Sequence, residues 1–290
     1  MYSVAWMLLA TSSFTLMAFI IKLQSPKFSV ADILFLRSTS SIAFVLGLNL
    51  FFRFRLRTRV FSVHARRSIC GLVSMSTWYY TLGVLPMGVS VTLNYMSPLF
   101  LGLILYWVGG QQSRPTRSEL AFVLLGFFGV LIMLNPFGST LGASDVLPVL
   151  LGVAAAFVAA LAFKDVRALK NAGENEWQMV FYFSMTAALF SFPLTSLARL
   201  EFTAQPVGYV LLGVAGIFGA LGQFGVSKAF GSGSQIVSAS LQYLSVVFSL
   251  LLSWLVLDER VSIAQVSGIA LITCAAVMTI AASQRRVAQA

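Results

Sequence analysis

The sequence predicts an all-α membrane protein in which ten transmembrane helices form two inverted five-helix repeats around a central cavity. Three observations support this fold class. The 290 residues are 58% hydrophobic and only 10% charged, with a mean hydropathy of +0.89, whereas a soluble domain carries about 25% charged residues. Apolar runs long enough to cross a bilayer follow one another along the chain. Two of these runs carry the same polar motif, 148 residues apart.

Turn signals divide the apolar sequence into ten spans. Proline, glycine and charged residues separate neighbouring runs, as at Ser25-Pro26, Leu85-Pro86 and Gly231-Ser232-Gly233. The longest connection, at about 53–66, is a basic loop, and we expect its histidine, His64, to be solvated. The predicted spans are 3–23, 30–52, 67–86, 88–108, 118–136, 145–165, 177–197, 206–229, 235–256 and 262–282.

The positive charges orient these spans, because cytoplasmic loops carry the excess of lysine and arginine. With the N-terminus inside, the inner loops hold fourteen basic residues and the outer loops hold four, and Arg37 remains within a span. We therefore expect a multi-pass protein of the cell inner membrane with both termini cytoplasmic. The net charge of +10 then reflects topology, and no nucleic-acid partner is expected.

The repeated motif lies in the fourth and ninth spans. Leu93-Asn94-Tyr95-Met96-Ser97 in the fourth corresponds to Leu241-Gln242-Tyr243-Leu244-Ser245 in the ninth, and the same offset pairs Gly71 with Gly219. One gapless offset over about forty residues indicates an internal duplication. Each half has an odd number of helices, so the second half enters the membrane upside down. Residues 1–140 and 141–290 are thus predicted to be inverted repeats.

The twin motif also predicts a substrate site. If the halves pack symmetrically, the two spans meet near the pseudo-twofold axis, and Asn94, Tyr95, Gln242 and Tyr243 face one cavity near mid-membrane. Pro98 cannot donate to the carbonyl of Asn94, so it bends the fourth span there, and we interpret it as a gating residue. The alternative is a polar residue paired with a neighbouring helix and an ordinary transmembrane proline.

Four further polar or aromatic residues are candidates for the substrate wall. Trp78 and Tyr79 form either a stacking surface for a planar or cationic ligand or an anchor at the membrane interface. Gln223 is a candidate on the eighth span. Arg37 lies roughly 10 Å below the start of the second span, at 1.5 Å per residue. It pairs either with a substrate carboxylate or with a protein carboxylate, or it snorkels to the interface.

Glycine recurs every third residue in the eighth span. Gly219 and Gly222 belong to this series, which runs from Gly213 to Gly225. Such a run thins several faces of a helix. One interpretation is close packing against two neighbouring helices, and the other is a pliable gate helix.

The sequence contains no pattern typical of an enzyme. It has no nucleophile motif, no phosphate-binding loop and no zinc-protease motif, so neither a cofactor nor a metal is expected. Cys70 and Cys274 are isolated within apolar runs, which fits small core residues. The acidic residues cluster at predicted span ends, so no carboxylate proton relay through the membrane is predicted.

These motifs resemble the EamA branch of the drug/metabolite transporter superfamily. Besides the twin motif, the resemblance rests on Phe35–Ser38, on Trp78-Tyr79-Tyr80 followed by Leu85-Pro86, and on Leu257–Arg260. Trp177–Tyr182 and Ser191–Leu194 are similar to members that carry S-adenosylmethionine or riboflavin, and the amino-acid exporters share the architecture. The resemblance implies a basket-like bundle in which helices 1, 3, 4, 6, 8 and 9 surround the cavity, with helices 5 and 10 at the back or at a dimer contact.

The repeat and the resemblance together predict a secondary transporter. We expect it to move a small amphipathic organic metabolite, either amino-acid-like or nucleoside- or vitamin-like, across the inner membrane by alternating access. Its partners would be the solute and the bilayer, and it would be a monomer or a homodimer. Two alternatives stay open: a flippase for a lipid-linked substrate, which needs a lateral opening lined by polar residues, and a membrane enzyme or scaffold.

Overall fold

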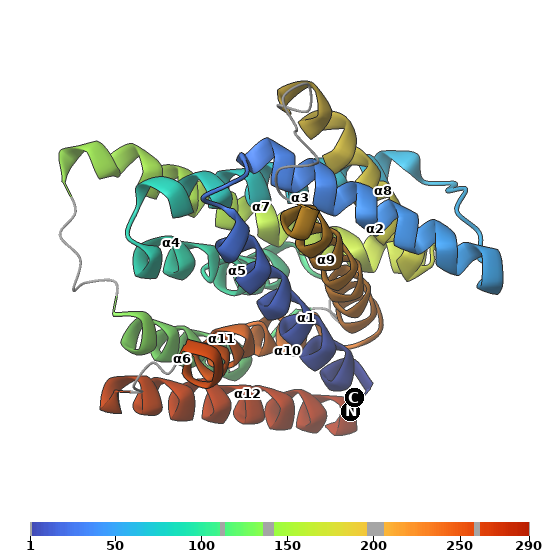
Figure 1. Cartoon of the computed structure of the whole chain (residues 1–290). Coiled ribbons are helices and arrows are strands. Elements are labelled where there is room, and N and C mark those ends of the chain that lie inside the picture. The colour runs from blue at the N-terminus through green and yellow to red at the C-terminus, as the bar shows by residue number, and fades with distance from the viewer. Residues whose placement is uncertain (1, 111–113, 136–141, 196–205, 258–261, 290) are drawn as a thin grey trace.

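The computed structural model describes residues 2–110, 114–135, 142–195, 206–257 and 262–289, and these ranges are helical with short connections (Figure 1). The resemblance segment at Asp258–Arg260 lies outside them. Short 3-10 helices η2 (Ala143–Asp145) and η3 (Phe192–Leu194) precede α7 and follow α8. The α-helices are α1 (Tyr2–Gln24), α2 (Val30–Phe52), α3 (Phe61–Val84), α4 (Met87–Asn94), α5 (Ser97–Val108), α6 (Arg117–Leu134), α7 (Val146–Asn171), α8 (Glu176–Ser191), α9 (Pro206–Ser232), α10 (Gln235–Leu241), α11 (Leu244–Leu257) and α12 (Ile263–Gln289).

These helices make up the ten predicted spans. The helices α4 and α5 together form one span, and α10 and α11 form another, each interrupted near its middle. Eight segments within the described ranges are long and apolar enough to cross a membrane. The remaining two spans are α3, whose first turns carry charges, and α8, which has 16 residues.

Two predicted boundaries are wrong at the basic end of the bundle. The helix α3 begins at Phe61 and not near residue 67, and α7 continues to Asn171 and not to about 165. His64 therefore lies on a helix and is fully buried, so the prediction of a solvated loop histidine is wrong. Burying the charged first turns of α3 requires partners for them, and Asp165 of α7 and Glu174 in the connection between α7 and α8 provide these partners.

Helices begin and end at corresponding positions in the two halves of the described chain. Adding 148 to Val84, the last residue of α3, and to Met87, the first of α4, gives Ser232 and Gln235. These are the last residue of α9 and the first of α10. The interruptions between α4 and α5 and between α10 and α11 also match within one residue at this offset.

The packing pairs correspond in the same way. The helix α1 lies along α9 and α7 lies along α3, while α2 contacts α9 and α8 contacts α3. Exchanging the halves converts the α1–α9 contact into the α7–α3 contact, and the α2–α9 contact into the α8–α3 contact. The helices α6 and α12, the last of each half, run side by side along one edge of the bundle (Figure 1).

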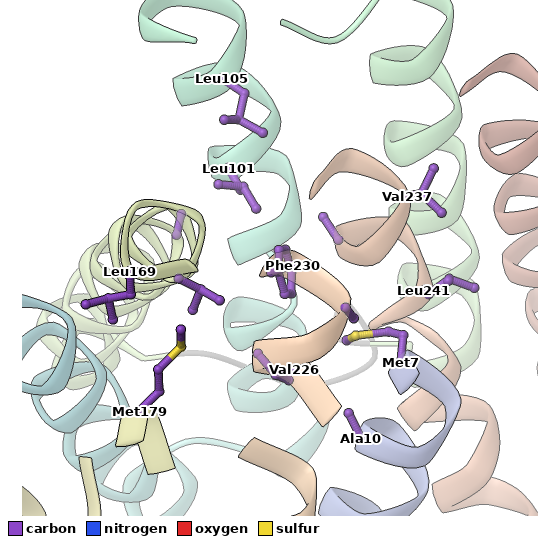
Figure 2. Packing of buried hydrophobic residues seen from close by; sticks show 14 of the residues in the cluster. Met7, Ala10, Leu101, Leu105, Leu169, Met179, Val226, Phe230, Val237 and Leu241 are labelled. Atoms are coloured by element: carbon purple, nitrogen blue, oxygen red, sulfur yellow. The ribbon is translucent and has the colours of Figure 1, made fainter. Parts of the chain in front are cut away.

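The principal core joins both halves at one end of the bundle. Figure 2 shows Leu101 and Leu105 of α5 in the same cluster as Val237 and Leu241 of α10. Side chains from α1, α7, α8 and α9 complete it, among them Met7, Val226, Phe230, Leu169 and Met179. The C-terminal part of one broken span is thus packed against the N-terminal part of the other.

The glycines of α9 allow two helices to approach it closely. A Cβ added to Gly216 would lie 2.4 Å from the Arg37 carbonyl oxygen of α2, and one on Gly222 would lie 2.6 Å from the Phe14 ring of α1. A Cβ on Gly219 would lie 3.1 Å from the Met17 sulfur. These contacts agree with the close-packing interpretation of the glycine series.

Gly216 and Gly213 provide a matched pair for this packing. We expect Gly216→Ala to destabilise the protein by about 1–3 kcal/mol, because its Cβ would overlap backbone that cannot yield. In Gly213→Ala the added Cβ meets the Ser40 hydroxyl at 3.4 Å, and the change should be neutral or slightly stabilising. Denaturant unfolding in detergent micelles measures both. Equal stability of the two variants would contradict the packing assignment.

Candidate functional site

The candidate site lies where the two broken spans are interrupted. In the first span, Pro98 occupies the first turn of α5, where it has no amide hydrogen to donate to the Asn94 carbonyl. The second span breaks without a proline. There the amides of Gln242 and Tyr243 donate to carbonyls three residues earlier, and the Ser245 hydroxyl donates to the Gln242 carbonyl at 2.5 Å. Each break therefore has its own local cause.

The two breaks touch each other. The Tyr95 hydroxyl, at the end of α4, donates to the Ser245 hydroxyl of α11 at 2.7 Å. The rings of Tyr95 and Tyr243 lie edge to face, with centroids 6.2 Å apart. On the other side, the Thr15 hydroxyl of α1 donates to the Ser245 carbonyl at 3.3 Å. Residues 150 positions apart in the sequence thus meet at the centre of the candidate site.

The four residues of the twin motif have different surroundings. Tyr243 is fully buried, and its ring packs against Phe127 and the bare backbone of Gly126 on α6. Its hydroxyl and the Gln242 amide nitrogen are buried with no hydrogen-bond partner among the described residues. Asn94 and Tyr95 are half-buried at the end of α4. The Tyr243 ring is therefore held in a hydrophobic cluster, while Asn94, Tyr95 and Gln242 lie at the break itself.

Arg37 is buried on α2 and faces α1 and α9. Its Nη1 donates to the Met17 sulfur at 3.1 Å, and its Nε has no partner among the described residues. Methionine sulfur is a weak acceptor. None of the ion pairs found within the described ranges includes Arg37, although an ion pair with Asp32 or Asp145 was one expectation. Those two aspartates accept hydrogen bonds from nearby backbone at helix starts.

Trp78 and Tyr79 lie together on α3, with ring centroids 5.4 Å apart. Both the indole Nε1 and the phenol hydroxyl are buried without a partner in the described chain. The Arg37 guanidinium is close enough to interact electrostatically with the Tyr79 hydroxyl. Gln223 is engaged elsewhere, because its Oε1 accepts from Arg67 Nη2 at 2.6 Å.

A polar network at the basic end of the bundle was not predicted from the sequence. Arg67 is buried, rests over the Phe183 ring and has two nitrogens without partners within the described ranges. His64 Nε2 donates to Glu174 at 3.0 Å. Helix-phase analysis starting at Phe61 would have placed His64 and Arg67 on adjoining positions of one face, three residues apart. Ion pairs at the same end are Arg66–Asp165, Lys170–Glu176, Lys228–Glu176 and Arg286–Glu119.

The His64–Glu174 pair lies at the charged start of α3, before the apolar part of that helix. Burial lowers the pKa of His64 below its ordinary value, and the neighbouring Arg67 charge acts in the same direction, against the effect of Glu174. For Glu174, burial acts to raise the pKa, but hydrogen bonds from His64 and the Arg59 amide hold it below its usual range. Neutral His64 therefore donates from Nε2 to an ionised carboxylate.

Acidification should weaken the fold through His64. Because its folded pKa is below the unfolded value of about 6.5, the unfolded state binds the proton first, and stability falls as the pH drops below about 6.5. We expect the thermal midpoint to fall by a few degrees between about pH 7.5 and about pH 5.5. His64→Gln keeps a donor for Glu174 but does not titrate in this range, so the thermal midpoint of this variant should depend less on pH. An unchanged slope in the variant would refute the assignment.

Tyr95 and Tyr243 allow the contact between the breaks to be measured against a control. Tyr95→Phe removes the bond to Ser245 and should cost about 0.6 kcal/mol, a typical value for a hydrogen bond within a membrane protein. Tyr243→Phe removes a buried hydroxyl that has no partner among the described residues, so stability should stay equal or rise. Unfolding in micelles tests both variants. A larger loss for Tyr243→Phe would show that the contact is assigned to the wrong tyrosine.

Comparison with known proteins finds similarity to membrane transporters. Residues 146–281 match the model of the EamA-like transporter family. A pseudopaline exporter of Pseudomonas aeruginosa is 26% identical over 270 residues, which cover 93% of this chain and 92% of the exporter. A riboflavin transporter of Brucella anthropi is 25% identical over 75% of each chain.

Two further comparisons agree with this result. An S-adenosylmethionine uptake transporter of Rickettsia conorii is 25% identical over 68% of this chain and 64% of its own. A crystal structure with 19% sequence identity superimposes with a TM-score of 0.81 over 98% of both chains, which shows the same fold. The chain is therefore a multi-pass membrane protein whose second half matches the EamA-like transporter family, and it is similar over most of its length to transporters of small molecules.

Proposed function

We propose that this protein is a secondary transporter that moves a small amphipathic organic metabolite across the inner membrane by alternating access. In this mechanism, residues 1–140 and 141–290 act as inverted repeats around one central site. The observation that carries the proposal is the meeting of two matched helix breaks, joined by the bond from Tyr95 to Ser245. A break in each half gives each half a place to bend.

The packing of the broken spans supports a conformation closed at one end. The helices α5 and α10 pack against each other through the core cluster. The other parts of the two broken spans pack on different helices. The helix α4 packs on α7, with Leu93 against Gly152, and α11 packs on α1. With the N-terminus cytoplasmic, the α5–α10 contact closes the inner side. Transport would then require this contact to open while α4 and α11 approach.

The positive-inside orientation has further support. The five ion pairs found among the described residues lie where α3, α6 and α8 begin and where α7, α9 and α12 end. This is the end that the basic loops assign to the cytoplasm. We propose an inner-membrane location with both termini inside, as a monomer or a homodimer.

Within this mechanism, the site residues have separate roles. Asn94, Tyr95, Gln242 and Tyr243 form the junction of the breaks, and the unpartnered Gln242 amide is available to a solute. The pair Trp78 and Tyr79 with Arg37 forms a second wall, while Gln223, whose Oε1 accepts from Arg67, borders the site nearer the basic end of the bundle. Gating is assigned to Pro98 at the first break and to Gly219 and Gly222, whose missing side chains let α9 slide past α1.

The names of the relatives support an organic metabolite as the solute. Transporters named for riboflavin and S-adenosylmethionine match most of this chain, as does the pseudopaline exporter. A wall that combines aromatic rings, amides and one arginine suits an amino-acid-like or a nucleoside- or vitamin-like molecule.

A lipid flippase is less well supported by the lateral surface. The described groove of about 380 Å³ between α2 and α9 opens sideways. Its walls are mainly apolar, formed by Ala43, Phe44, Val210, Val214 and Ile217. A polar headgroup crossing the membrane in this groove would have almost no hydrogen-bonding partners, at a cost of several kcal/mol.

Transport into proteoliposomes tests the proposal. A panel of radiolabelled amino acids, nucleosides and vitamins identifies a transported solute, and the double variant Asn94→Ala with Gln242→Ala should reduce its uptake by at least about tenfold, the equivalent of 1.4 kcal/mol. Asn171→Ala, which removes an exposed amide at the end of α7, serves as the control and should leave uptake unchanged. Full activity in the double variant for every transported solute would overturn the site.

A further inference from the structure

Arg37 is a buried cation that forms no ion pair with the residues that the structure describes. Its side chain is 3% exposed, its Nη1 contacts only the Met17 sulfur at hydrogen-bond distance, and its Nε has no partner among the described residues. A guanidinium is always charged, and burying it without a counter-anion costs several kcal/mol. Arginines inside membrane spans therefore pair with an anion or line a functional cavity.

The other half of the chain contains the anion that is missing here. At the 148-residue offset, Met17 of α1 corresponds to Asp165 of α7, and Gly219 of α9 corresponds to Gly71 of α3. Met17 contacts Arg37 beside Gly219. Asp165 accepts two hydrogen bonds from Arg66, at 2.6 and 2.7 Å.

The two arginines are not equivalent, because Arg66 lies on α3 and Arg37 lies on α2, so the comparison concerns only the residue that the matched helices α7 and α1 present to them. Asp165 also lies close enough to Arg67 to stabilise the charge of that second arginine. Around Arg37, the corresponding place is taken by an uncharged methionine. Tyr79, Trp78 and Ser38 add polar atoms that are buried without partners in the described chain, and Tyr79 interacts electrostatically with Arg37. Among the described residues, Arg37 therefore has polar neighbours but no strong hydrogen-bond acceptor.

We infer that a carboxylate of the transported solute provides this acceptor by pairing with the Arg37 guanidinium beside Met17. This inference rests on the proposed function and gives its solute a chemical class, an organic acid with an apolar or aromatic body. A guanidinium binds a carboxylate through two parallel hydrogen bonds, a geometry that also selects for planar anions. The Trp78 and Tyr79 rings provide an aromatic surface beside it.

A carboxylate fits this position better than a phosphate. The described surroundings contain one guanidinium and neutral side chains, so a single negative charge balances the site. A doubly charged phosphate group would leave one charge uncompensated in a medium of low dielectric constant. The solute's charge is thus expected to decide binding, and the solute's apolar body is expected to tolerate variation.

Benzoate and benzamide provide a direct test because they differ in charge and share the ring. The purified protein in detergent is titrated with each compound at constant ionic strength, and binding is measured by calorimetry and by the rise of the thermal midpoint. We expect benzoate to bind at least about tenfold more tightly than benzamide, and phenylphosphonate to bind more weakly than benzoate. Equal binding of benzoate and benzamide, or no binding of benzoate, would overturn the inference.

Met17 allows the missing anion to be restored within the protein. Met17→Asp places a carboxylate beside Arg37, as Asp165 lies beside Arg66, and should reduce benzoate affinity at least about tenfold while the protein remains folded. Met17→Asn has the same shape without the charge and should retain affinity within about threefold. Arg37→Lys keeps the charge without the planar fork and should weaken benzoate binding. Unchanged benzoate affinity in both Met17→Asp and Arg37→Lys would refute the pairing.

The outcomes separate this inference from the proposed function. Benzoate binding that depends on Arg37 in a protein that transports no solute in liposomes would support the anion site and refute the transport mechanism. Transport of uncharged solutes by a protein that binds benzamide as well as benzoate would support the mechanism and refute the anion site.

Discussion

The contact between the two broken spans is the constraint on which the rest of the structure depends. A helix interrupted inside a bilayer exposes backbone groups that lipid cannot satisfy, so each break must be covered by protein. Here the breaks cover each other: Tyr95 at the end of α4 donates to Ser245 after the second break, and Ser245 also donates to the Gln242 carbonyl. Two irregular segments thereby become one stable junction, and the spans can bend there without leaving polar backbone in lipid.

The junction is asymmetric although the halves correspond closely in helix ends. By the 148-residue offset, the partner of the Tyr95–Ser245 bond would join Tyr243 to Ser97, yet the Tyr243 hydroxyl has no partner among the described residues. The same asymmetry separates Met17 from Asp165 near the arginines. We propose that these departures from symmetry mark polar atoms that a solute can bind.

Much of this architecture could be predicted from the sequence, because span length, loop charge and the repeated motif each depend on local composition. The ten spans and the family agree with the structure and the comparisons. The basic end could not be predicted in this way. His64 and Arg67 read as loop or boundary residues, and their burial depends on Glu174, Gln223 and Phe183 of distant segments. The partners of Arg37 could not be predicted from the sequence either, because the choice between a protein carboxylate and a solute depends on which side chain α1 presents.

The central claim is that the junction is a pivot about which the two ends of the broken spans open in turn. Distances between spin labels in lipid nanodiscs test it most directly, after Cys70 and Cys274 are replaced. One pair, at Trp107 and Ser232, reports on the end where α5 and α10 pack, and a second pair, at Val84 and Trp254, reports on the opposite end. The account predicts two distances for each pair of labels. When conditions shift the populations, the distance at one end should lengthen while the distance at the other end shortens. A single fixed distance for both pairs, or lengthening of both together, would contradict it.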